Sequence, residues 1–448
     1  MTVPAGQGEA AGLAARPGWV DRKAPSLRHR NYLLFFFGQL VSVIGTWMQT
    51  VAQSFLVLDL THSGTELGLT TAARFLPMLV FGPAGGLYAD RHDKRRILYV
   101  TQTLSGLLAA AFAICLATGS MHLWVVYLLA AALGFVNVFD NPARQSFISE
   151  MVPERDLANA VLLNSISVNM ARVFGAAVGG TVAAVLGLTL CFTLNAVSFV
   201  AVLASLAAMS AAALYPARKV AKEKGQVRAG LRYVGSKSEI LIPMIMIAVV
   251  GTLAWEFPVS LPLMASSVFN GWIFHNAAAA YGMMASVMGA GAVVGGFVSA
   301  GRVKPGARSL CLASIGWGVA ILVAALAPDM PVELAAMLFV GYGSITFNAL
   351  AKTTLQLAAK PEMRGRVMAL WGLAWLGSTP IGGPIIGWIG ENLGARWGLV
   401  VGGVTALACG ILALGWSVSR ATAQARAGAG DSERERGSQA PASAEATG

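Results

Sequence analysis

The sequence predicts an all-α membrane protein with twelve transmembrane helices in two pseudo-symmetric six-helix bundles. The first observation is composition, because 56% of the 448 residues are hydrophobic and only 12% are charged, about half the charge of a soluble protein. The second is that apolar runs of 18 or more residues recur, each long enough to cross a bilayer as a helix. The third is that these runs lack the alternation of barrel strands, and only helices and closed barrels satisfy their backbone in lipid.

The apolar runs give the elements in order along the chain. We expect spans at 31–55, 66–89, 96–118, 123–147, 160–184, 189–213, 240–265, 277–300, 309–327, 331–355, 367–390 and 397–419. The segments around them predict an N-terminal tail at 1–30, a first bundle at 31–214, a linker loop at 215–239 and a second bundle at 240–420. Residues 421–448 are rich in Ala, Ser, Gly, Glu and Arg, which predicts a disordered tail.

The distribution of positive charge predicts the orientation in the membrane. With a cytoplasmic N-terminus, 29 of the 32 Lys and Arg residues lie in cytoplasmic tails and loops, and only Arg396 lies in an outer loop. This is a strong positive-inside bias, so we expect both termini in the cytoplasm and the chain in the plasma (inner) membrane. The net charge of +11 therefore reflects topology and contact with lipid headgroups, not nucleic-acid binding.

The two halves carry an internal repeat. When the chain is shifted by 208 residues, FDNPARQSFISEMVPERDLANAV at 139–161 falls on FNALAKTTLQLAAKPEMRGRVMA at 347–369 without a gap. The shift also places spans 4 and 5 on spans 10 and 11. Two six-span halves have the same orientation, and parallel repeats of this kind usually enclose a binding site at their interface.

The loop between spans 2 and 3, GLYADRHDKRR at 86–96, holds six charged residues. It resembles the loop 2–3 signature of the major facilitator superfamily, with Asp93 at a position where that signature has glycine. FDNPARQ at 139–145 and NMARVFGAAVGG at 169–180 resemble the branch that contains the enterobactin exporter and the transmembrane secretion effectors. The resemblance covers about 30–420, although the second copy of the loop signature, at 295–306, has no aspartate.

The resemblance implies that span 2 packs beside span 11, with Asp90 facing the positive N-terminal end of span 11. We therefore expect a cytoplasmic latch that forms when that side is closed. The alternative is a positive-inside anchor, which would not need an aspartate. The latch candidates are Asp90, Arg91, Asp93, Lys94, Arg95 and Arg96.

Polar residues in span 1 recur every three or four positions, which places them on one helix face. Such a face lines a wet cavity or forms hydrogen bonds between helices, and both readings stay open here. The resemblance implies that spans 1, 4, 7 and 10 line a central cavity. The cavity candidates are Gln39, Ser42, Thr46, Gln49, Gln53, Asn137, Asn141, Trp255, Ser344 and Asn348.

Four charged residues lie at membrane depth, where each costs about 2.5–3.5 kcal/mol at a helix centre and is a functional candidate. Helical rise places Arg74 and Glu256 at similar heights in the outer third, so they are candidates for an outer gate pair. Glu256 is also a candidate for proton coupling or for a solvated vestibule residue. Asp140 and Arg172 lie lower and are expected to pair within the first half.

Small residues in spans 5 and 11 predict close packing between the two halves. GAAVGG at 175–180 resembles the antiporter signature, with Ala176 where that signature has proline, and GGPIIG at 382–387 keeps the proline. The expected contacts are Gly175, Gly179, Gly383, Pro384 and Gly387.

These features predict a secondary transporter that works by alternating access, and no catalytic, metal or cofactor motif accompanies them. The resemblance implies export of a bulky compound such as a siderophore or drug, driven by protons. The alternatives are an importer or facilitator of a small solute and a non-transporting membrane receptor or scaffold. We expect a small-molecule substrate, the lipid bilayer and coupled protons as partners, and a monomer.

Overall fold

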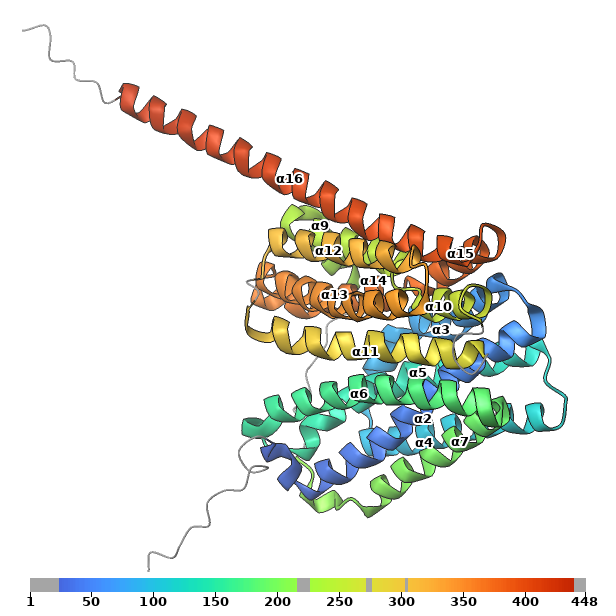
Figure 1. Ribbon diagram of the computed structural model, residues 1–448. Coiled ribbons are helices and arrows are strands. Elements are labelled where there is room, and N and C mark those ends of the chain that lie inside the picture. Colours follow the sequence, from blue (N-terminus) through green and yellow to red (C-terminus); the bar gives the residue numbers. More distant parts are fainter. Residues whose placement is uncertain (1–23, 216–225, 271–275, 303–304, 439–448) are drawn as a thin grey trace, which may run out of the picture.

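The computed structural model describes residues 24–215, 226–270, 276–302 and 305–438, and these ranges contain helices and no strand. In Figure 1, α2, α4, α6 and α7 lie in the lower part of the molecule and α9, α12, α13 and α16 in the upper part, with α3, α5 and α11 between them. Within the described ranges, 11 helices are long and apolar enough to cross a membrane. The all-helical membrane fold predicted from the sequence is therefore confirmed.

The first half consists of six long helices after a short 3-10 turn, η1, at Pro25–Arg28. Their bounds are α2 Arg30–Thr61, α3 Gly64–Arg91, α4 Lys94–Ala117, α5 Leu123–Met151, α6 Glu154–Leu186 and α7 Leu188–Ala208. Each helix overlaps one expected span. Most helices are several residues longer than the span, because their ends include polar residues outside the apolar run.

The second half contains two helices that are interrupted inside the membrane. Its bounds are α9 Ser238–Leu253, α10 Phe257–Ser267, α11 Ala277–Arg302, α12 Ala307–Ala325, α13 Met330–Ala358, α14 Arg364–Leu376, α15 Thr379–Asn392 and α16 Ala395–Ser438. Span 7 is thus divided into α9 and α10, and span 11 into α14 and α15. Pro258 and Pro380 stand in the first turn after each break, where proline lacks the amide that a continuous helix would need.

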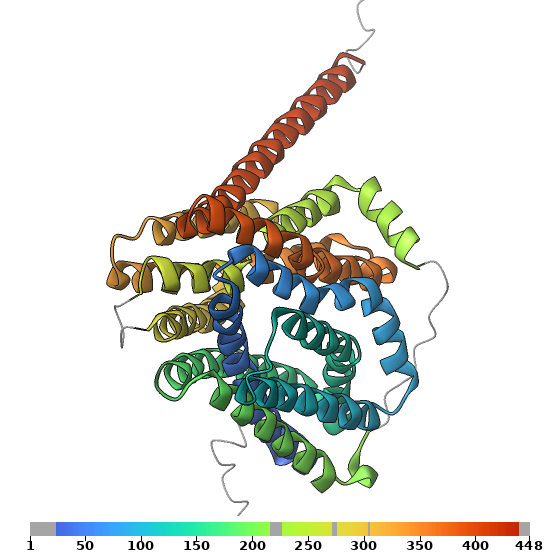
Figure 2. The same ribbon diagram turned by 90° about the vertical axis from the view of Figure 1, so that its right-hand side faces the viewer.

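Two segments outside the spans differ from the expected domain plan. The linker loop expected at 215–239 contains α8, Gln226–Ser236, whose Tyr233 hydroxyl accepts a hydrogen bond of 3.1 Å from the backbone amide of Lys360. The tail expected to be disordered from 421 is helical as far as Ser438, and α16 projects beyond the bundle in Figure 2. Its Ala, Arg, Gln and Glu residues have high helix propensity. Residues 439–448 lie outside the described ranges.

The halves meet along two seams, one between α3 and α15 and the other between α6 and α11. A Cβ placed on Gly68 would lie 2.3 Å from the carbonyl oxygen of Gly383 and 2.8 Å from Cα of Pro384. A Cβ on Gly387 would lie 2.1 Å from the carbonyl oxygen of Gly64. These backbones touch because neither helix has a side chain there.

The second seam does not use the glycines that the sequence predicted for it. Gly175 and Gly179 pack against Ile44, Trp47 and Met48 of α2, inside the first half. Gly180 makes the contact between the halves instead. A Cβ on Gly282 of α11 would lie 2.8 Å from Cα of Gly180. One residue along a helix turns its direction by about 100°, so the glycine repeat alone could not say which glycine faces which neighbour.

Both seams end near the middle of the molecule. Among the glycine contacts of the two seams, those nearest the 86–96 loop join Leu79 to Gly377 and Val173 to Gly289. Further along α3, toward the face that carries the 86–96 loop, a Cβ on Gly82 or Gly86 would meet no described atom within 4 Å. We call the face of this loop the basic face. The halves are therefore closed together at the opposite face and separated toward the basic face.

Candidate functional site

A polar cavity of about 290 Å³ lies within the first half, lined by residues from all six of its helices. Its walls combine carboxamide groups with three charged side chains and several apolar ones. A second cavity of about 240 Å³ continues toward the opposite face and touches Pro258 of α10 in the second half. Thr46 and Arg74 line both cavities, so they stand where the two spaces meet.

The polar face of span 1 lines these cavities, and part of it also bonds to other helices. We call the five polar residues of this face, Gln39, Ser42, Thr46, Gln49 and Gln53, the polar stripe. Four of them line the first cavity, and Thr46 and Gln53 line the second. Gln49 is buried and its Oε1 accepts a short hydrogen bond from Nδ2 of Asn195 in α7. The stripe thus serves both roles that the sequence left open. The stripe residues of the first cavity are Gln39, Ser42, Thr46 and Gln49.

Asp140 is buried in the wall of the first cavity and is surrounded by donors. Thr101 Oγ1 and Gln102 Nε2 of α4 each donate to its Oδ1 at 2.7 Å, and the Arg144 guanidinium pairs with its Oδ2. The expected pair with Arg172 is wrong. Arg144 lies one helical turn away on the same helix, so it reaches the carboxylate without any dependence on helix packing.

The remaining two arginines at membrane depth have different surroundings. The guanidinium of Arg172 lies over the Trp47 ring, 4.9 Å from its centroid, and does not line either cavity. Arg74 donates to Thr50 Oγ1 at 3.4 Å, and no carboxylate of the described residues forms an ion pair with it. The expected Arg74–Glu256 pair is therefore absent from this conformation, although the opposite face is closed.

Glu256 lies at the break between α9 and α10, with 2% of its surface exposed. Both carboxylate oxygens are buried, and no described cation pairs with them; the Thr379 hydroxyl at the start of α15 is the side-chain donor that lies beside them. A Cβ on Gly382 would lie 3.0 Å from Oε1, and one on Gly383 would lie 3.7 Å from Oε2 and 3.0 Å from the Gly68 carbonyl oxygen. The carboxylate therefore occupies space left by two glycines of α15, directly behind the seam with α3.

The other candidates in the second half do not line the described cavities. Trp255 belongs to an aromatic cluster and its ring centroid lies 4.5 Å from that of Trp375 and 5.8 Å from that of Trp317. Ser344 is buried and donates to the Gly341 carbonyl of its own helix, and Asn348 is half-buried on the same helix.

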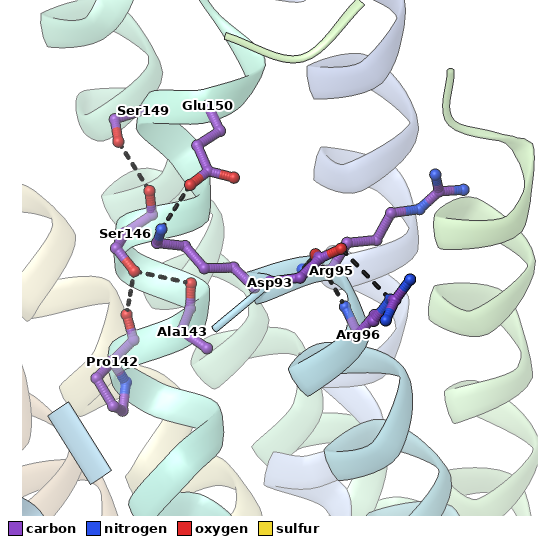
Figure 3. Close-up of polar contacts among 9 residues, drawn as sticks. Asp93, Arg95, Arg96, Pro142, Ala143, Ser146, Ser149 and Glu150 are labelled. Atoms are coloured by element: carbon purple, nitrogen blue, oxygen red, sulfur yellow. Dashed lines mark hydrogen bonds and ion pairs between the residues drawn. The ribbon is translucent and has the colours of Figure 1, made fainter. Parts of the chain in front are cut away.

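The charged loop mostly ties the first half together (Figure 3). Asp93 caps the N-terminus of α4 through the amides of Arg95 and Arg96, and Lys94 Nζ lies 2.5 Å from Glu150 Oε1 at the end of α5. Arg95 donates to the carbonyl oxygens of Leu206 and Met209 at the end of α7. A cation at a helix C-terminus is stabilised by the helix dipole.

The end of α3 itself is more open. Asp90, Arg91 and Arg96 are exposed, and Arg96 Nε lies 3.6 Å from Asp93 Oδ2.

An interaction that the sequence analysis missed closes the opposite face. Glu391 Oε2 in the last turn of α15 accepts from Ser63 Oγ at 2.7 Å and from the backbone amide of Thr65 at 2.9 Å. Ser63 is also the N-cap of α3. Four other polar residues of the first half were missed as well. They are Thr101, Gln102, Asn164 and Asn195.

Comparison with known proteins places this geometry in context. The family model described as transmembrane secretion effector matches residues 23–434, almost the whole chain. The enterobactin exporter EntS of Citrobacter koseri is 23% identical over 402 residues, which cover 89% of this chain and 94% of that protein. Macrolide efflux protein A of Streptococcus pyogenes is 23% identical over 404 residues, covering 85% and 95%.

The staphyloferrin A transporter of Staphylococcus aureus is 28% identical over 173 residues, and this match spans 38% of the chain and only 43% of that protein. The crystal structure of a bacterial homologue of the lysosomal transporter Spinster, in an inward-facing and unoccupied conformation, superposes with a TM-score of 0.66 at 16% identity. It covers 87% of this chain and 97% of that one, which supports the fold alone.

Proposed function

The chain belongs to the transmembrane secretion effector family of the major facilitator superfamily, and we propose that it exports a bulky organic compound by alternating access. Its fold and its relatives are those of secondary transporters. The observation that carries the proposal is the polar cavity beside two glycine seams that close one face only. A cavity that can face alternate sides is the requirement for transport between two compartments.

The direction of transport and the orientation are part of the proposal. With the basic loops in the cytoplasm, the structure corresponds to a state that is closed outside and separated inside. Such a state would load substrate from the cytoplasm. The names of the enterobactin exporter and the macrolide efflux protein support export of a siderophore-like or drug-like compound.

We assign proton coupling to Glu256. An ionised carboxylate that is buried without a paired cation is strongly destabilised, so the neutral protonated form suits the conformation described here. Opening of the α3–α15 seam would expose the same carboxylate beside Gly383, where it would take up a proton from the outside. When the seam closes again, the proton would leave toward the basic face, and this inward proton flow would drive export of the substrate.

We also assign the cytoplasmic latch to Asp90. In the state described here it is exposed, and it would approach the start of α14 near Arg364 only when the basic face closes. The loop residues Lys94 and Arg95 would then hold α3 and α4 in place through their bonds to α5 and α7. They position the latch and do not form it.

The test is transport in membrane vesicles of both orientations with an imposed pH gradient. Inside-out vesicles that contain the protein should accumulate a siderophore or macrolide when the lumen is acidic, and vesicles without the protein should not. Accumulation only in right-side-out vesicles would indicate import and contradict export. Equal, gradient-independent equilibration in both would indicate a facilitator.

A further inference from the structure

Arg74 is a cation without an anionic partner in the wall of the polar cavity. It lines both cavities, makes one described hydrogen bond, to Thr50 Oγ1 at 3.4 Å, and interacts electrostatically with the uncharged phenol of Tyr281 in α11. A guanidinium has five N–H groups, so most of its donors are unused by the described residues. Leaving a charge without a partner at this depth is costly, which argues that something else completes it.

The two other arginines of the first half's interior already have their partners. Arg144 pairs with Asp140, and Arg172 lies over the Trp47 ring away from both cavities. Asp140 is the one carboxylate among the residues that line the first cavity, and it is also bonded to two α4 side chains. The charge of Arg74 is therefore not balanced from within the cavity, which has one net positive charge.

An independent observation points the same way. Gln39 lines the first cavity with 3% of its surface exposed, and its Nε2 donor has no hydrogen-bond partner. Gln39 lies eleven residues before Thr50 on α2, so it stands about 16 Å from the level of Arg74 along the helix. Nε2 itself is buried, so a ligand that reaches both Gln39 and Arg74 would be extended and would meet this donor only after the amide turns into the cavity.

We propose that Arg74 binds an anionic group of the transported compound, which is therefore an organic anion with an extended, partly apolar body. This inference rests on the proposed function and specifies its substrate. The guanidinium would take a carboxylate, sulfonate or phenolate through paired hydrogen bonds, a geometry that arginine provides better than lysine. The apolar body would contact the remaining cavity wall, which includes Val43, Phe75, Met78, Leu133 and Phe199.

The test compares two probes that differ in one charged group. Full-length protein in phosphatidylcholine nanodiscs is titrated with 8-anilinonaphthalene-1-sulfonate and with N-phenyl-1-naphthylamine, which has the same rings without the sulfonate. Saturable binding is read by energy transfer from tryptophan, after subtraction of empty nanodiscs. We expect Arg74→Gln to weaken sulfonate binding at least tenfold and to leave binding of the neutral probe within twofold.

Two further variants separate charge from structure. Arg74→Lys should retain part of the sulfonate affinity, and Arg172→Gln, which removes an arginine outside the cavities, should change neither probe. The proposal is overturned if Arg74→Gln binds the sulfonate as the wild type does, weakens both probes equally, or if the wild type shows no preference for the sulfonate. If anionic phosphatidylglycerol in the nanodisc abolishes the difference, the anion held by Arg74 is a lipid headgroup and the substrate assignment fails.

The same variants distinguish this inference from the proposed export. Sulfonate binding that depends on Arg74, without movement of either probe in vesicles, would contradict export and leave the anion site in place. Transport of the neutral probe by both wild type and Arg74→Gln, with no effect on the sulfonate, would support export and contradict the anion site.

Discussion

Glu391 and Thr65 join the two halves of the protein at the face opposite the basic loops. The Glu391 carboxylate, at the end of α15, accepts from the backbone amide of Thr65 at 2.9 Å and from its hydroxyl at 2.5 Å, in the first turn of α3. A carboxylate at a helix N-terminus is favoured by unpaired amides and by the helix dipole. The sequence predicted the same kind of contact between these two spans at the other face, from Asp90 to the start of α14.

Removing the charge of Glu391 should favour opening of this face. We expect Glu391→Gln to increase the open population about two- to fivefold, as suits a surface contact of roughly 0.3–1 kcal/mol. The measurement is the distance distribution between spin labels at Leu60 and Leu393, which are exposed on opposite halves. Asn392→Ala is the matched control, because the Asn392 amide bonds only to the Trp388 carbonyl of its own helix. An unchanged distribution in Glu391→Gln would show that the contact does not hold the gate.

The same contact should respond to acid. Glu391 lies one residue beyond the expected span 367–390, and hydrogen bonds from Thr65 and Ser63 hold the pKa of its carboxyl below its usual range. The pKa of the Glu391 carboxyl is lower in the closed state than in the open state. The contact therefore stabilises the closed state fully above the ordinary glutamate pKa of about 4.3, and this stabilisation is lost as pH falls through the lowered pKa. The label distance in the wild type should lengthen over that range, whereas Glu391→Gln should show no such step. A lengthening of equal size in both would assign the response to another group.

Glycines on a seam and glycines within one half should have different effects when they gain a methyl group. Gly387→Ala would place Cβ 2.1 Å from the Gly64 carbonyl, so it should open the α3–α15 seam and impair transport with little change in Tm. Gly175→Ala would place Cβ 2.6 Å from the Ile44 carbonyl inside the first half, so it should lower Tm. Gly372→Ala, which meets nothing within 4 Å, is the control for both. The assignment of the seams is wrong if Gly175→Ala alone shifts the label distances.

Glu256→Gln should uncouple transport from the proton gradient. The amide has nearly the size of the protonated carboxyl and cannot release a proton, so accumulation against a concentration difference should disappear while downhill exchange continues. Glu333→Gln is the matched control, since Glu333 is also buried with both oxygens unpartnered but lies in the first turn of α13. Uphill transport that survives in Glu256→Gln and disappears in Glu333→Gln would move the proton site to Glu333.

Asp90→Asn should weaken closure of the basic face. The contact with the α14 N-terminus would lose its full charge, so the separated state described here should gain population about two- to fivefold. Spin labels at Val161 and Leu357, both exposed and on opposite halves, report that distance. Asp90→Glu keeps the charge and should behave nearly as the wild type. A normal distribution and normal transport in Asp90→Asn would leave the loop as an anchor for the first half.

The sequence by itself determined the features that depend on local composition and periodicity. Twenty-residue apolar runs fix membrane spans because lipid offers the backbone no hydrogen bonds. The three-and-four spacing placed Gln39 to Gln53 on one face of α2, and that face does line the cavities. The breaks in spans 7 and 11 could not be predicted in this way. Pro258 and Pro380 follow them, but Pro77, Pro83 and Pro142 lie inside helices that continue without a break.

Only the tertiary structure decided which side chains meet. Depth along the helix placed Arg74 and Glu256 at one level, yet Arg74 faces the cavities and Glu256 faces Gly382 and Gly383 of α15. Periodicity gives the direction of a side chain relative to its own helix, whereas its neighbour depends on how that helix is rotated and packed. Asp140 shows the local case, because Arg144 lies one turn away and binds it whatever the packing. Gly180, and not Gly179, contacts α11 at the seam. This depends on how α6 is rotated relative to α11, which cannot be read from the order of residues along the chain.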